Sequence, residues 1–193
     1  MSDSSETQPD LTFELHVACM LNDPDRVTDL LARGADPEGL NGTGATVIEM
    51  ADFLQRLEVT KRLLAHINIV EAGSVELLKA IRLNRPTVVR ALLEMGLKDQ
   101  LSDGEFFKGI LILSCCTASS NVVEMLVKYG PGISMVQNEQ LLLHVAAVAK
   151  SMDVIEFIRK SAEEERLGSM NRPPSAQVNG VHLHNGASSV DRI

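Results

Sequence analysis

The chain has 193 residues, of which 45% are hydrophobic, and this is enough apolar material for one domain with a buried core. Only 3% are aromatic, which favours packed helices over a β-sandwich. The net charge is −8 and no run of Lys and Arg offsets it, so we expect no binding to nucleic acid.

The expected location is inside the cell. No apolar stretch approaches the roughly 20 residues that cross a bilayer, and residues 1–6 are polar and acidic, unlike a secretory signal. Cys19, Cys115 and Cys116 lack the spacing of a metal site and are expected to be reduced. We therefore expect a cytoplasmic protein that does not contact a membrane, with the nucleus as the alternative location.

Residues 1–10 are expected to form a disordered tail, and a repeated pattern follows them. Leu15-His16-Val17-Ala18 begins the pattern and the apolar pair Leu30-Leu31 closes it. Ile48-Glu49-Met50-Ala51 and Leu63-Leu64 repeat the same register 33 residues later. A period of this size indicates stacked units of supersecondary structure.

Five units are found when a small residue is matched to an apolar residue twelve positions later. The pairs are Ala18 with Leu30, Ala51 with Leu63, Ala80 with Leu92, Ser114 with Leu126, and Ala146 with Ile158. Each unit is predicted to be two antiparallel helices, because apolar residues recur at three- and four-residue spacing with turn residues between them. Ala80 follows Ala51 by only 29 residues, so a shortened connection is expected there.

Capping residues mark the expected ends of these helices. Thr46-Val47-Ile48-Glu49 and Ser102-Asp103-Gly104-Glu105 fit the capping box of a helix start, and the second should begin a longer helix. Pro24 and Pro86 suit the first position of second helices. The glycines expected to end second helices in the left-handed conformation are Gly34, Gly96 and Gly130.

Residues 166–193 are rich in turn formers and are expected to form a second disordered tail. Val181-His182-Leu183-His184 has no third metal ligand nearby, so a metal site is not expected. Val190-Asp191-Arg192-Ile193 has an ending that can add as a strand to a PDZ-type groove, and chance is the alternative explanation for it.

Several of these segments resemble the ankyrin repeat family, whose motif G-x-T-P-L-H-x-A-A is followed by V-x-x-L-L and G-A-D. They are residues 44–51 (GATVIEMA), 15–18 (LHVA), 143–147 (LHVAA) and 30–37 (LLARGADP). The resemblance implies an all-α fold, an ankyrin-repeat solenoid of stacked antiparallel helix pairs, with about five repeats over residues 11–165. The Pro of the motif is absent from every unit, and the third and fourth units lack the T-P-L-H core.

The resemblance also implies a protein-binding scaffold without enzymatic activity. His16 and His144 occupy the motif position at which the family uses imidazole to hydrogen-bond neighbouring loops. Gly42-Thr43-Gly44 is not followed by the Lys of a phosphate-binding loop and is read as a hairpin tip. We therefore expect no catalytic residue, no cofactor and no metal. The expected function is an adaptor or inhibitor subunit; the alternatives are a self-associating module and the regulatory part of a longer protein.

In ankyrin arrays the two residues after the Ala-Ala pair of each first helix line the concave face. By that register they are Met20 and Leu21, Phe53 and Leu54, Arg82 and Leu83, Cys116 and Thr117, and Val148 and Ala149. Burial by longer first helices is the alternative to an exposed groove. With two neighbouring arginines added, the predicted partner-binding residues are Met20, Leu21, Phe53, Leu54, Arg56, Arg82, Leu83 and Arg85. Arginines beside apolar positions predict a protein partner with an amphipathic, acidic segment.

Overall fold

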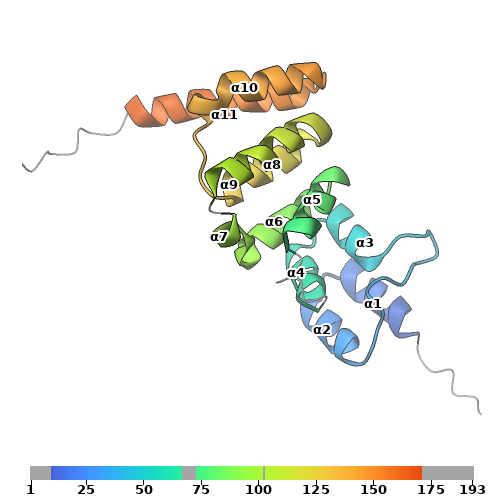
Figure 1. Cartoon of the computed structure of the whole chain (residues 1–193). Coiled ribbons are helices and arrows are strands. Elements are labelled where there is room, and N and C mark those ends of the chain that lie inside the picture. Colours follow the sequence, from blue (N-terminus) through green and yellow to red (C-terminus); the bar gives the residue numbers. More distant parts are fainter. Residues whose placement is uncertain (1–9, 67–72, 102, 171–193) are drawn as a thin grey trace, which may run out of the picture.

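The computed structural model describes residues 10–66, 73–101 and 103–170, and within these ranges the chain is helical, without strands. A single bridge between Leu40 and Thr46 closes the one extended hairpin of the described residues. Figure 1 shows the helices following one another as pairs from one end of the molecule to the other. The all-α prediction is therefore confirmed for the described part of the chain.

Each pair consists of a first and a second helix. The first helices are α1 (Leu11–Met20), α3 (Val47–Phe53), α5 (Gly73–Arg82), α8 (Gly104–Thr117) and α10 (Met135–Val148). The second helices are α2 (Pro24–Ala32), α4 (Leu57–His66), α6 (Pro86–Leu92), α9 (Ser120–Tyr129) and α11 (Met152–Met170). A wide turn, Leu93–Leu97, and the short helix α7 (Lys98–Gln100) connect α6 to the segment before α8.

The predicted helix starts agree with the structure at several positions. The Thr46 hydroxyl accepts a hydrogen bond from the Glu49 N–H at 3.3 Å, and the Glu49 carboxylate accepts one from the Thr46 N–H at 2.9 Å. Pro24 and Pro86 begin α2 and α6, where the missing N–H has no partner to lose. The start of α8 differs in its capping residue, because Asp103 accepts from the Glu105 N–H, while Ser102 lies outside the described residues.

Two of the three predicted glycine ends are confirmed, and one is wrong. Gly34 and Gly96 have φ of 94° and 102°, in the left-handed region that favours glycine. Gly130 has φ of −75° and is extended. It is required for space instead, because a Cβ there would lie 2.4 Å from the Leu126 carbonyl oxygen and 2.5 Å from the Phe107 ring.

The C-terminal helix is longer than predicted. Residues 166–170, expected to belong to a disordered tail, continue α11 to Met170. Polar contacts to the start of α10 account for the extension, because Arg166 pairs with Glu139 and the Glu165 carboxylate accepts from the Met135 N–H at 2.7 Å. The boundary at 166 is corrected accordingly, and residues 171–193 lie outside the described part.

The buried apolar residues form two clusters that divide the helix pairs. One cluster lies in the first two pairs and runs from Leu15 to Leu63, whereas the other begins at Leu64 and extends to Ala162. The second helices form a continuous layer, in which α2 contacts α4, α4 contacts α6 and α6 contacts α9. Among the first helices, α1 contacts α3 and α8 contacts both α5 and α10, but α3 packs on α6 in place of α5. The row of first helices is therefore open between α3 and α5.

Candidate functional site

The turn between the two helices has the same backbone conformation in four of the five pairs. Asn22, Gln55, Asn84 and Lys150 have positive φ, between 54° and 59°. The next residue in each pair donates its N–H to a carbonyl five residues back, as Asp23 does to Ala18, Arg56 to Ala51, Arg85 to Ala80 and Ser151 to Ala146. The alanines that were matched by spacing therefore occupy one structural position, and this turn places the residues just before it.

The positions predicted to line the concave face are mostly exposed. The side chain of Phe53 at the end of α3 is 85% exposed, and that of Met20 at the end of α1 is 50% exposed. Leu21, Leu83 and Val148 are exposed as well. The first helices α1 and α3 end at these residues, so burial by longer first helices is wrong for them. The further predicted positions are Leu54 and Ala149, which are partly buried, and Cys116 and Thr117, which are exposed.

An open hollow, which we call the N-terminal hollow, surrounds the predicted apolar positions of α1 and α3. Its volume is about 570 Å³. It is lined by Met20, Asn41, Thr43, Ala45, Glu49, Met50, Phe53 and Leu54. The hairpin that is closed by the bridge between Leu40 and Thr46 supplies one wall, while the ends of α1 and α3 supply the other. Three of the apolar lining residues, Met20, Phe53 and Leu54, are therefore among the concave-face positions predicted from the sequence.

The three predicted arginines have different surroundings. Arg56 is partly buried and its Nη2 donates to the Met20 carbonyl at 3.4 Å, so it holds the end of α1. Arg85 pairs with Glu49 at 2.5 Å. Arg82 is exposed and makes no ion pair with any residue in the described ranges. Of the three arginines, only Arg82 therefore keeps its charge available on the surface. The sequence pattern alone could not distinguish it from the other two.

A second open hollow, the C-terminal hollow, lies between α5 and α8, and the positions predicted from the sequence include two of its lining residues, Arg82 and Thr117. It is lined by Val75, Leu78, Lys79, Arg82, Leu113 and Thr117, and its volume is about 380 Å³. Val75, Leu78 and Arg82 follow each other at three- and four-residue spacing and so share one face of α5. That spacing was the signal available in the sequence, but the register considered only the last residues of each first helix.

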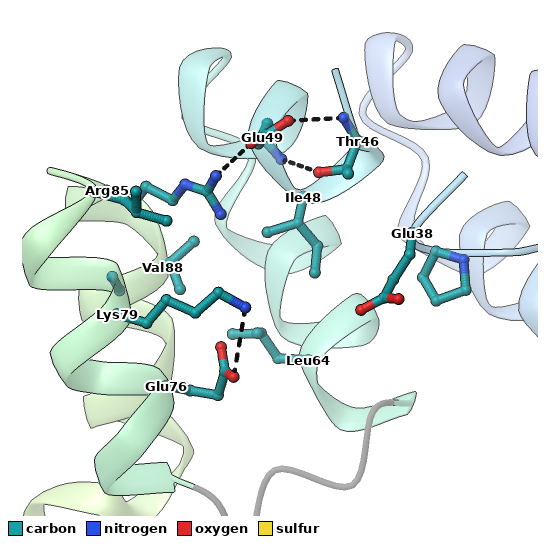
Figure 2. Close-up of a pocket in the computed structure, with 12 residues that line it drawn as sticks. Glu38, Thr46, Ile48, Glu49, Leu64, Glu76, Lys79, Arg85 and Val88 are labelled. Carbon is teal, nitrogen blue, oxygen red and sulfur yellow. Dashed lines mark hydrogen bonds and ion pairs between the residues drawn. The ribbon is translucent and has the colours of Figure 1, made fainter. Parts of the chain in front are cut away.

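A central cleft of about 280 Å³ opens where α3 and α5 separate, as Figure 2 shows. Its floor is apolar and includes Leu64 and Val88, both buried. Three carboxylates and two cationic side chains also line it, and the Glu49 side chain is turned toward both Thr46 and Arg85 (Figure 2). The hydrogen bond from the Thr46 backbone, together with the Arg85 charge, lowers the pKa of Glu49.

Neighbouring hollows share a lining residue. Glu49 lines both the N-terminal hollow and the central cleft, and Lys79 lines both the cleft and the C-terminal hollow. We use the word groove below for this series of three hollows, whose lining residues come from the chain between α1 and α8.

The two motif histidines differ in their contacts. His16 is buried, and its Nδ1 and Nε2 lie 2.9 Å and 3.3 Å from the carbonyl oxygens of Thr12 and Ala45. The predicted bond to a neighbouring loop is therefore confirmed for His16. His144 is exposed on α10, and no hydrogen bond joins its ring to another described residue, so the prediction is wrong there. It belongs to the last helix pair of the described residues.

Two of the three cysteines, Cys19 and Cys115, are buried. Burial raises the pKa of the Cys19 thiol to about 11 and that of the Cys115 thiol to about 12, so both are protonated near neutral pH. Cys116 is exposed, and all three thiols are free. Within the described ranges, no group of three His, Cys, Asp or Glu side chains is placed to hold a metal ion.

Two segments singled out in the sequence lie outside the described residues: the His-x-His segment 181–184 and the C-terminal segment 190–193. None of the helices in the part that the structure covers is long and apolar enough to span a bilayer.

Comparisons with known proteins identify no relative. No protein-family model matches the chain, and no curated protein gives a significant match to its sequence.

Proposed function

We propose that this chain is a non-enzymatic ankyrin-repeat scaffold, an adaptor or inhibitor subunit that binds another protein in the groove. The observation that carries the proposal is the exposed ring of Phe53, with Met20 and Met50 beside it in the N-terminal hollow. Burying a side chain of this size is worth about 1.5–3 kcal/mol, so a partner that covers it gains affinity. Apolar side chains gathered in a hollow are typical of a protein-binding surface.

The ankyrin part of the proposal is supported by local structure. The same turn follows Ala18, Ala51, Ala80 and Ala146, and the first two of these are 33 residues apart. His16 contacts the hairpin of the next pair through the carbonyl oxygen of Ala45. These features match what the ankyrin resemblance implies for the hairpin and the Leu-His-x-Ala segment.

The proposed location is the cytoplasm or the nucleus. All three cysteines are free, including exposed Cys116, and free thiols persist in a reducing compartment. The protonated, buried thiols of Cys19 and Cys115 act as small apolar groups in the two cores.

The test compares proteins captured by the full chain and by two variants. Phe53→Asp puts a charge into the N-terminal hollow, and we expect it to weaken partner binding by about 2–4 kcal/mol, as for a central apolar contact. Met152→Asp puts the same charge on an exposed apolar residue at the start of α11, away from the groove, and should bind normally. Captured proteins are identified by mass spectrometry, and binding is remeasured with the purified partner by calorimetry.

Circular dichroism separates loss of binding from loss of fold. Phe53 is so exposed that Phe53→Asp should keep the parent spectrum at about 25 °C. A folded Phe53→Asp chain that binds the purified partner as tightly as the parent would falsify the proposal that the groove is the binding site.

A further inference from the structure

The C-terminal hollow is built from apolar side chains that remain in contact with water. Val75 on α5 is 66% exposed and Leu113 on α8 is 40% exposed, with partly buried Leu78 between them. They come from neighbouring first helices, α5 and α8, which contact each other. The hollow is therefore a fixed apolar surface held by two packed helices.

Positive charge surrounds this apolar surface. Arg82 and Lys79 both line the hollow, whereas none of the lining residues is a carboxylate. Lys79 lies 3.7 Å from Glu76 at the surface, a weak pair, and Arg82 has no carboxylate partner among the described residues. In a chain with a net charge of −8, this hollow therefore carries a local excess of positive charge.

The contrast with the other two predicted arginines identifies Arg82 as the one available for recognition. Arg85 is neutralised by Glu49, and Arg56 donates to a backbone carbonyl. A guanidinium group binds a carboxylate through two parallel hydrogen bonds and also lies flat on apolar surface. Arg82 beside Val75 and Leu113 provides both kinds of contact in one place.

We propose that the C-terminal hollow binds an acidic, amphipathic segment of the partner. An apolar side chain of that segment packs on Val75, Leu78 and Leu113, and a neighbouring Asp or Glu pairs with Arg82. This inference rests on the proposed function and specifies the chemistry of the bound segment. It also narrows the acidic contact from the three predicted arginines to Arg82, on the face between α5 and α8.

The test uses a displayed library of random peptides selected on the immobilised full chain. We expect the enriched peptides to carry Asp or Glu close to Leu, Ile or Phe. Their binding, measured by fluorescence anisotropy, should weaken about tenfold or more in Arg82→Glu, because an attraction becomes a repulsion. Binding should also weaken as salt is raised. Changing the acidic residue of the peptide to Lys should restore binding to Arg82→Glu.

Arg62→Glu is the matched control. Arg62 is likewise an exposed arginine, but it lies on second helix α4, 3.9 Å from exposed Asp25 and outside the groove. Its reversal makes the same change in net charge, so peptide binding should stay within about twofold of the parent. Circular dichroism of both variants should match the parent, since both side chains are at the surface.

The outcomes distinguish this inference from the proposed function. Peptides that lose binding in Phe53→Asp but carry no acidic enrichment and bind Arg82→Glu normally overturn the acidic-segment inference and leave the groove in place. Peptides that are weakened equally by Arg82→Glu and Arg62→Glu also overturn it, because the effect is then one of net charge. Peptides that bind Phe53→Asp and Arg82→Glu as they bind the parent contradict both proposals.

Discussion

A side-chain carboxylate of the second helix pair caps a helix of the third pair. Asp52, near the end of α3, accepts hydrogen bonds from the N–H groups of Thr87 and Val88 at 2.9 Å and 3.2 Å, and so caps the start of α6. Burial raises the pKa of Asp52 despite these bonds, which shows that desolvation outweighs them. The side chain therefore acts as a helix cap that is supplied by the neighbouring pair.

Removing this cap tests its contribution. Asp52→Ala should lower the free energy of unfolding by about 1–3 kcal/mol, because two partly buried N–H groups lose their acceptor. Asp52→Asn keeps an acceptor oxygen without a charge to desolvate, so its loss should be smaller. Urea denaturation of both variants measures the difference, and equal losses would show that the charge, and not the acceptor, is what matters.

Leu92 tests the packing of the middle pair. Its side chain is 1% exposed at the end of α6, within the larger cluster. Leu92→Ala should cost about 2–5 kcal/mol, because transfer free energy is lost and a cavity is left. Leu83→Ala, at an exposed leucine nine residues earlier, should cost about 0.5 kcal/mol or less. A urea midpoint for Leu92→Ala equal to that of the parent would contradict the placement of the middle pair.

At the scale of the helix, two glycines should respond to alanine with opposite sign. Gly96 has φ of 102° in the turn after α6, and a Cβ there meets no atom within 4 Å, so backbone strain alone sets the cost, about 1–2 kcal/mol. Gly109 lies inside α8 and is exposed, with equally free space for a Cβ. Gly109→Ala should stabilise by about 0.5–1 kcal/mol through helix propensity. Thermal unfolding of the two variants measures both effects. Melting temperatures that shift in the same direction would contradict the left-handed turn at Gly96 or the helical position of Gly109.

Most of the helices could be predicted from the sequence, because their signals are local. The capping box at Thr46, the prolines at the helix starts and the spacing of Ala18 from Leu30 depend on neighbouring residues only. Contacts between one helix pair and the next were harder to predict from the sequence. That Arg85 is neutralised by Glu49, 36 residues away, is set by how α3 meets α6, and no periodicity contains that information.

The candidate site was predicted in part for the same reason. Phe53 and Met20 were predicted from the register of the ankyrin resemblance, and the turn after each first helix fixes the position of the residues before it. Val75 and Leu113 were missed because their hollow depends on the approach of two helices that are separated in sequence. Leu83 and Arg85 were predicted and line the central cleft, but the cleft itself follows from the packing of α3 on α6 and was not predicted.

The whole molecule should lose stability in acid. Hydrogen bonds from Lys61 lower the pKa of Glu94, those from the Ser120 backbone lower the pKa of Asp153, and those from Ser134 lower the pKa of Glu165. A folded-state pKa below the unfolded value of about 4 gives stability that is complete above that value and is lost as the pH falls through the folded pKa. Asp52, with its raised pKa, changes stability in the opposite direction.

With that of Glu49 included, four lowered carboxylate pKa values against one raised value predict a net loss of unfolding free energy between about pH 5 and about pH 3. Urea midpoints measured across this range should fall. Glu94→Gln should reduce the slope, because the amide no longer titrates beside Lys61 and Arg90. Glu163→Gln, on an exposed part of α11, is the control and should keep the parent slope. A urea midpoint of the parent that does not change with pH would contradict the proposed link between these carboxylate pKa values and stability.

The division of the core between Leu63 and Leu64 has a mechanical consequence. The first helices are separated at the central cleft, and the layer of second helices continues behind it through α4 and α6. We expect the stack to bend most readily at this point, and bending about the α4–α6 contact would change the span from Phe53 to Leu113. A partner anchored at both ends of that span selects one curvature, so a substitution under the cleft can alter affinity without touching the partner.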